Sequence, residues 1–341
     1  MKEKITYGLI KGFKSIFLFL LLSFPFLVMA QDESWYQKGR DATEPGEIIN
    51  FLTKSIEFEG ESVCTYYYRG VAKFQLGDYN GAASDFSKAM TVKSKYQTAI
   101  QRRDDLSNNP EAQTNVYLHD KTDSSNTEQC RGLCYYYRGN SFYNLHNYNS
   151  AIEDYSKFIP LDIENHEYFN SRCTAYYLRS ASYFYLKQYD LAFADISKYV
   201  SLKPKDPDGY NNLGLIYLIK GNYDEAIRQF KETIGINQNY ASAYADIGYA
   251  YMQQGKTNLA VENFQHCLKI DTNTFSTYLD LSIIEYRKNN ITQAKKYFEI
   301  AKSLEPDLSE GFEVISEFET EGFFWTQKDK ETLKIIFNNL K

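Results

Sequence analysis

The sequence of 341 residues predicts an all-α fold, a right-handed superhelical array of antiparallel helix pairs, or α-solenoid. The first observation is a fixed spacing, because Ala192, Ala226, Ala260 and Ala294 follow one another at intervals of 34 residues. The second is that aromatic and small residues recur at i, i+3, i+4 and i+7 ahead of each alanine, which gives a helix one apolar face. No such unit buries its face alone, so a core forms only when neighbouring units stack.

The same frame of residues surrounds these alanines in consecutive windows. The window 207–240 has Tyr210, Gly214, Tyr217, Ala226 and Phe230, and the window 241–274 has Tyr244, Gly248, Tyr251, Ala260 and Phe264. A period of 34 with these spacings resembles the tetratricopeptide repeat. The resemblance implies two helices per repeat and a concave groove, lined by the first helices, that commonly binds extended peptides or partner helices.

The frame extends in both directions and divides the chain into parts. We expect a signal peptide (1–30), a degenerate N-terminal repeat (31–62), six repeats (63–96, 132–172 with an insertion, 173–206, 207–240, 241–274 and 275–308) and C-terminal capping helices (309–341). Residues 97–131 are polar and rich in turn-forming residues, so they form either an irregular segment or a degenerate repeat. His146 takes the place of a glycine in the turn between two helices.

The N-terminus has the layout of a secretory signal. A basic leader precedes an apolar run, and Ala30 precedes the polar residues Gln31 and Asp32. The run is about fourteen residues long, shorter than the roughly 20 that span a bilayer as a helix. We therefore expect an exported protein, periplasmic or extracellular, with no membrane span in the mature chain. Its net charge of −6, carried together with a basic leader, argues against nucleic acid as a partner.

Tyr-Tyr-Tyr-Arg-Gly occurs twice, at 66–70 and 135–139. In three repeats an arginine at the seventh position is followed sixteen residues later by an aspartate, in the pairs Arg69 with Asp85, Arg138 with Asp154 and Arg179 with Asp195. The other three repeats have an aliphatic residue at that position and no aspartate. Because a partly buried arginine needs a carboxylate partner, we predict ion pairs within the repeats. A ladder of arginines for anionic ligands is the alternative.

Positions that line the groove in the family are aromatic or amide-bearing in this chain. The groove candidates are Tyr67, Tyr136, Asn140, Tyr143, Asn144, Tyr177, Tyr185 and Asn211. Tyr136 stands where family members that bind chaperone tails have the first lysine of a carboxylate clamp, so recognition of a free C-terminus by that clamp is not expected. These tyrosines could instead be buried against neighbouring repeats.

Motifs for catalysis are not found. The sequence has no Gly-rich phosphate loop, no nucleophile elbow and no zinc-protease motif, and its four histidines share no metal-ligand spacing. We therefore expect a non-enzymatic scaffold without cofactor or metal, which binds a protein or peptide partner. A glycan-binding module is the alternative, because tyrosine and asparagine also suit sugars.

Three of the five cysteines, Cys130, Cys134 and Cys173, lie at the starts of two consecutive repeats. In an oxidising compartment this placement favours a disulfide between Cys173 and either Cys130 or Cys134.

Overall fold

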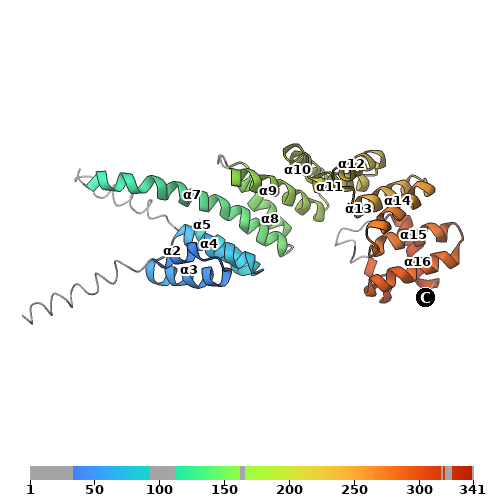
Figure 1. The fold of residues 1–341 in the computed structure, drawn as a ribbon, viewed down its shortest axis with the longest axis horizontal. Coiled ribbons are helices and arrows are strands. Elements are labelled where there is room, and N and C mark those ends of the chain that lie inside the picture. Colours follow the sequence, from blue (N-terminus) through green and yellow to red (C-terminus); the bar gives the residue numbers. More distant parts are fainter. Residues whose placement is uncertain (1–33, 93–111, 162–165, 316–317, 319–324, 340–341) are drawn as a thin grey trace, which may run out of the picture. The chain divides into compact units, whose positions relative to one another are not determined.

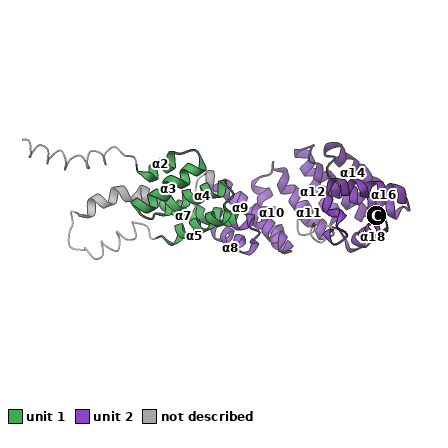
Figure 2. Ribbon diagram, turned by 90° about the horizontal axis from the view of Figure 1, so that it is seen from below, with its two compact units in different colours: residues 1–141 green, residues 142–341 purple. Residues whose placement is uncertain are grey.

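The computed structural model describes residues 34–92, 112–161, 166–315, 318 and 325–339, and only the backbone of 112–126 and 166–167. The predicted signal peptide, 1–30, lies outside these residues. All regular elements of the described part are helices, and none of them is long and apolar enough to cross a membrane. The chain forms two compact units, residues 1–141 and 142–341 (Figure 2).

Unit 1 consists of helices that pack on their neighbours in sequence. They are α2 (Trp35–Asp41), α3 (Pro45–Glu59), α4 (Val63–Gln75), α5 (Tyr79–Thr91) and most of α7 (Ala112–Asn144). The short helix α2 and α3 occupy the region of the expected degenerate repeat. Gly70 of α4 lies against the ring of Phe86 on α5, since a Cβ at Gly70 would meet that ring at 2.7 Å. The glycine of the first Tyr-Tyr-Tyr-Arg-Gly motif is therefore a close-contact position between two helices.

Helix α7 differs from the expected organisation. Residues 112–131 belong to one helix of 33 residues that continues into the next repeat, whereas their composition favoured an irregular segment or a degenerate repeat. Near its C-terminal end, still within unit 1, the helix is packed on α5, because Tyr137 stacks on Phe86 at a centroid distance of 5.9 Å. Extending an existing helix costs much less than starting one, so polar residues ahead of a packed segment can remain helical.

Unit 2 consists of successive helix pairs, most easily followed from α11 to α16 in Figure 1. Its elements are α8 (Tyr148–Phe158), α9 (His166–Tyr185), α10 (Tyr189–Leu202), α11 (Pro207–Ile219), α12 (Tyr223–Ile236), α13 (Ala241–Gln253), α14 (Thr257–Ile270), α15 (Phe275–Arg287), α16 (Ile291–Leu304), the 3-10 helix η1 (Pro306–Ser309) and α18 (Gln327–Asn339). The fold is an all-α solenoid. The insertion expected before residue 173 lengthens α9, which begins at His166.

Glycines of the repeat frame bring the two helices of each pair together. A Cβ at Gly214 would meet the ring of Phe230 at 2.6 Å, and one at Gly248 would meet the ring of Phe264 at 2.7 Å. The turn between the helices needs a left-handed residue, which is glycine at Gly221 with φ of 75°. His146, with φ of 57°, occupies the same kind of turn.

The C-terminal segment, by which we mean the described residues after 308, covers the last repeats of unit 2. Phe337 of α18 packs on Phe298 of α16, with ring centroids 4.8 Å apart. Trp325 is buried and donates from Nε1 to Oδ1 of Asp280 at 3.0 Å. Asp329 is fully buried and accepts hydrogen bonds from Tyr249 at 3.0 Å and from Gln253 at 2.7 Å. These contacts join the C-terminal segment to α13, α15 and α16.

Asp280→Asn should change how the stability of unit 2 depends on pH. Burial raises the pKa of Asp280 well above its usual value; Asp329 and Asp246 add to the rise, and Trp325 and Arg287 oppose it. An acid with a raised folded pKa stabilises the protein below its unfolded pKa of about 4, and this contribution is lost as the pH rises. Asparagine keeps an acceptor for Trp325 and has no proton to lose.

Thermal unfolding at pH 5 and at pH 8 measures this effect. We compare the melting temperature of the variant with that of the wild type at each pH. The difference, variant minus wild type, should be about 2–5 °C larger at pH 8 than at pH 5. The exposed Asp307→Asn is the control and should show no such increase. Equal pH dependence of wild type and Asp280→Asn would show that Asp280 is ionised in the folded protein throughout this range.

Candidate binding site between helices α9 and α11

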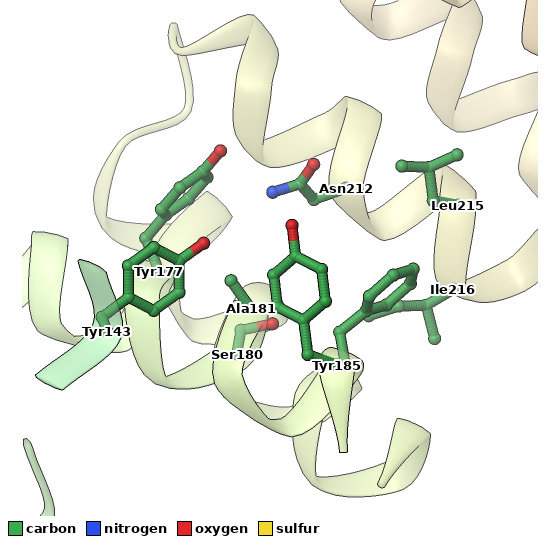
Figure 3. A pocket seen from close by; sticks show the side chains of 9 residues that line it. Tyr143, Tyr177, Ser180, Ala181, Tyr185, Asn212, Leu215 and Ile216 are labelled. Atoms are coloured by element: carbon green, nitrogen blue, oxygen red, sulfur yellow. The ribbon is translucent and has the colours of Figure 1, made fainter. Parts of the chain in front are cut away.

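A cavity of about 230 Å³ lies between the first helices of two consecutive repeats, α9 and α11. The cavity is lined by Tyr143, Tyr177, Ser180, Ala181, Phe184, Tyr185, Asn212, Leu215 and Ile216. Figure 3 shows Tyr143, Tyr177 and Tyr185 gathered at the cavity, with the amide of Asn212 close to their hydroxyl groups. Aromatic rings and small residues from α9 therefore face polar and aliphatic residues from α11.

The helical repeat places these side chains on one side of each helix. In α9 the lining residues are spaced i, i+3, i+4, i+7 and i+8 from Tyr177 to Tyr185, and in α11 they are spaced i, i+3 and i+4 from Asn212 to Ile216. Residues at these spacings share a helix face. Ser180 and Ala181 are small, so they leave the space that the surrounding rings enclose.

Contacts between the rings hold the walls of the cavity. Tyr185 is stacked on Tyr148, with centroids 4.7 Å apart and an interplanar angle of 11°. Tyr143 is tilted against Tyr185 at 6.5 Å. Phe184 meets Tyr189 edge-on at 5.7 Å. These side chains are fixed by neighbours before any ligand binds, which reduces the entropy that binding costs.

The polar groups at the cavity are neutral. Tyr177 and Asn212 both line the cavity, and burial raises the pKa of Tyr177. Burial also raises the pKa of Tyr143. Both hydroxyls therefore stay protonated at physiological pH and can donate hydrogen bonds. None of the nine lining residues carries a charge.

Three of the groove candidates predicted from sequence, Tyr143, Tyr177 and Tyr185, line the cavity. The structure places the others elsewhere. Tyr67 is buried in unit 1 and contacts Tyr137 and Phe86, at 5.9 and 6.3 Å respectively.

The remaining candidates are Tyr136, Asn140, Asn144 and Asn211, and none of them lines the cavity. Asn140 and Asn211 are buried, Tyr136 is half-buried and Asn144 is exposed. The asparagine at the cavity is Asn212, at the sixth position of its repeat rather than the fifth. One residue turns the side chain by about 100° around a helix with 3.6 residues per turn.

The structure brings two of the predicted arginine–aspartate pairs together. Arg179 donates to both carboxylate oxygens of Asp195, at 2.6 and 2.8 Å, and Arg69 donates to both oxygens of Asp85, at 2.8 and 2.7 Å. Arg138 donates to Ser87 at 2.9 Å within unit 1. Its pairing with Asp154 would join the two units and stays a prediction.

All five cysteines are buried free thiols in the structure. Cys64, which the sequence analysis did not single out, is hydrogen-bonded to Cys130, and this contact, followed by burial, raises the pKa of Cys130. A disulfide from Cys173 to Cys130 or Cys134 would join the two units, so it stays a prediction as well. In the described part of the chain no three histidine, cysteine or acidic side chains are placed to hold a metal ion.

Family models and solved structures agree on the repeat. Models described as tetratricopeptide repeat match residues 174–206, 196–228 and 241–274, and a model described as TPR repeat matches residues 214–255. A search among curated proteins finds no match.

The similar solved structures have low sequence identity to this chain. The structure of the hetero-tetramer Cut9–Hcn1 of the APC/C is 16% identical with a TM-score of 0.50, and the match covers 77% of this chain and 44% of that one. The MamA protein is 24% identical (TM-score 0.45; 62% and 92% covered). YrrB, titled a TPR protein with an unusual peptide-binding site, is 18% identical (TM-score 0.48; 66% and 95% covered). The 34-residue frame, the paired helices and the matched models together show that the chain contains tetratricopeptide repeats.

Proposed function

We propose that this protein is a non-enzymatic scaffold that binds an extended peptide or a helix of a protein partner, with the cavity between α9 and α11 as the anchor site. The observation that carries the proposal is the cavity itself, with four aromatic side chains and a neutral amide at its walls. Aromatic residues supply much of the energy of protein interfaces, because they bury a large area at little cost in conformational entropy.

Export is part of the same proposal. It is supported by the basic leader, the apolar run and the small residue Ala30 before a polar sequence. A scaffold outside the cytoplasm would meet its partner in the cell envelope or the extracellular space. N-terminal sequencing of the protein from its native host should find a chain that begins at or near Gln31. Recovery of the chain with its leader still attached would contradict the proposal that the protein is exported.

Filling the cavity tests the anchor site without removing any aromatic side chain. Ala181→Leu places a larger side chain among the rings, so we expect the amount of cross-linked partner captured from the native host to fall about tenfold. The melting temperature should change by only a few degrees, about 2–4 °C, because the cavity has room for part of the new side chain.

The matched control is Ser201→Leu, an exposed position on α10 in the same repeat. It adds a leucine of the same size away from the cavity and should leave capture unchanged. Normal capture by Ala181→Leu would contradict the anchor site. A glycan is the second candidate ligand, since ring faces and an amide also suit sugars. A polysaccharide retained by the wild type and not by Ala181→Leu would favour it.

A further inference from the structure

The first-helix face next to the cavity has an unusual charge pattern. We define this face by six positions of each of the three repeats that begin at residues 173, 207 and 241. They are the second, fifth, sixth, ninth, twelfth and thirteenth positions. The face defined in this way includes most of the residues that line the cavity. The structure describes all these positions, and the only charged residues among them are Asp208 and Asp246. The face is therefore acidic, with aromatic, aliphatic, amide and hydroxyl groups around the two carboxylates.

Asp208 lies where a ligand in the cavity would meet the field of its carboxylate. Asp208 accepts a hydrogen bond from Tyr240 at 2.8 Å and is exposed. Its charge, together with that of Asp206, acts on the hydroxyl of Tyr177 at the cavity and raises the pKa of Tyr177 further. A positive charge bound there would be attracted, and a negative one repelled.

Asp246 occupies the sixth position of its repeat, one repeat after Asn212 of the cavity. At the same position of the next repeat, Asp280 receives a hydrogen bond from Trp325. Asp246 has no hydrogen bond or ion pair with any residue that the structure describes. Burial raises its pKa to about 7. Besides burial, the charge of Asp246 raises the pKa of Tyr240, Cys267 and Asp280, and none of these three side chains carries a positive charge. A partly buried carboxylate without a partner is costly, and a cation would relieve that cost.

We propose that the ligand of this face is a basic peptide segment. The aliphatic stem of one lysine or arginine lies in the cavity with its cation near the rings and Asp208, and a second cation along the segment pairs with Asp246. Long basic side chains bury their stems on apolar surface, and aromatic rings attract cations. This inference rests on the proposed function and specifies the chemistry of the partner.

Three labelled peptides of the same length test the proposal on the full mature chain. They share a Gly-Ser-Tyr background and carry lysine, norleucine or glutamate at the same four places, and their dissociation constants are measured by fluorescence anisotropy. We expect the lysine peptide to bind about tenfold more tightly than the norleucine peptide, and the glutamate peptide to bind most weakly. Equal binding of lysine and norleucine peptides would overturn the basic preference and leave the anchor site standing. Failure of the lysine peptide to bind would also overturn the inference, whereas the anchor site is judged separately by capture of the native partner.

A variant of Asp246 separates this site from the general negative charge of the protein. Asp246→Asn should reduce the preference for lysine over norleucine about fivefold, while Glu262→Gln should leave it within about twofold. Glu262 is exposed on α14 of the same repeat, so both variants remove one negative charge from one repeat. The preference should also grow from pH 6 to pH 8 in the wild type, as Asp246 ionises, and stay level in Asp246→Asn. Equal effects of the two variants would assign the attraction to net charge and overturn the site.

Discussion

Arg179→Ala should lower the free energy of unfolding by about 2–4 kcal/mol, because it leaves the carboxylate of Asp195 mostly buried without its partner. The two side chains are only 17% and 9% exposed, so water compensates little for the lost charge. Arg179 also donates to Ser156 at 2.9 Å, and that contact is lost with it. Denaturant unfolding of wild type and variant measures the difference.

The repeats without an arginine indicate how to rescue the variant. Repeat 207–240 has Leu213 and Gln229 at the positions of Arg179 and Asp195, and both are buried. Arg179→Leu combined with Asp195→Gln should therefore recover most of the lost stability, since it removes both charges together. The double variant contradicts the pairing if it is no more stable than Arg179→Ala. Lys157→Ala, which breaks the exposed pair with Glu153, is the control and should cost less than about 1 kcal/mol.

The sequence could predict the repeat and its helix pairs because both depend on local patterns. Gly214 and Phe230 recur as Gly248 and Phe264 one period later, and each glycine lies against its aromatic partner. The spacing of sixteen residues between arginine and aspartate likewise joins two helices of one repeat. Such contacts repeat with the frame, so their geometry can be read from spacing alone.

The cavity was only partly predictable, because it depends on which residues of neighbouring helices meet. Tyr177 and Tyr185 belong to α9, while Tyr143 comes from the preceding repeat and Asn212 from the following one. Spacing alone places each side chain on a helix face and leaves open whether it reaches its neighbour. Tyr67 has the same repeat position as Tyr177, yet it is buried among the aromatic residues of unit 1.

The C-terminal contacts lie outside the repeat frame altogether. Asp329 comes eighty residues after Tyr249 and about half as many residues after Arg287. Neither separation is a multiple of the 34-residue period of the repeats. The sequence analysis expected capping helices after residue 308 and gave no reason for an aspartate inside them. Only the structure shows that this carboxylate reaches the side chains of two repeats.

Asp329→Ala should detach the start of α18 and lower the free energy of unfolding of the C-terminal repeats by about 2–4 kcal/mol. The carboxylate accepts from Tyr249, Gln253 and Thr326 and forms an ion pair with Arg287 at 2.8 Å, so alanine leaves polar groups of four residues without this partner. Phe337 and the other apolar residues of α18 still hold its far end on α16, which keeps the effect local.

The fluorescence of Trp325 reports this detachment directly in a background of Trp35→Phe, since the chain has two tryptophans. In the folded protein Trp325 is 6% exposed, so its emission should move to longer wavelength and become accessible to acrylamide in Asp329→Ala. The control is Asp307→Asn, which removes an exposed charge close to the same segment and should leave the emission unchanged. An Asp329→Ala protein with unshifted emission and wild-type stability would mean that the apolar residues of α18 alone hold the C-terminal segment in place.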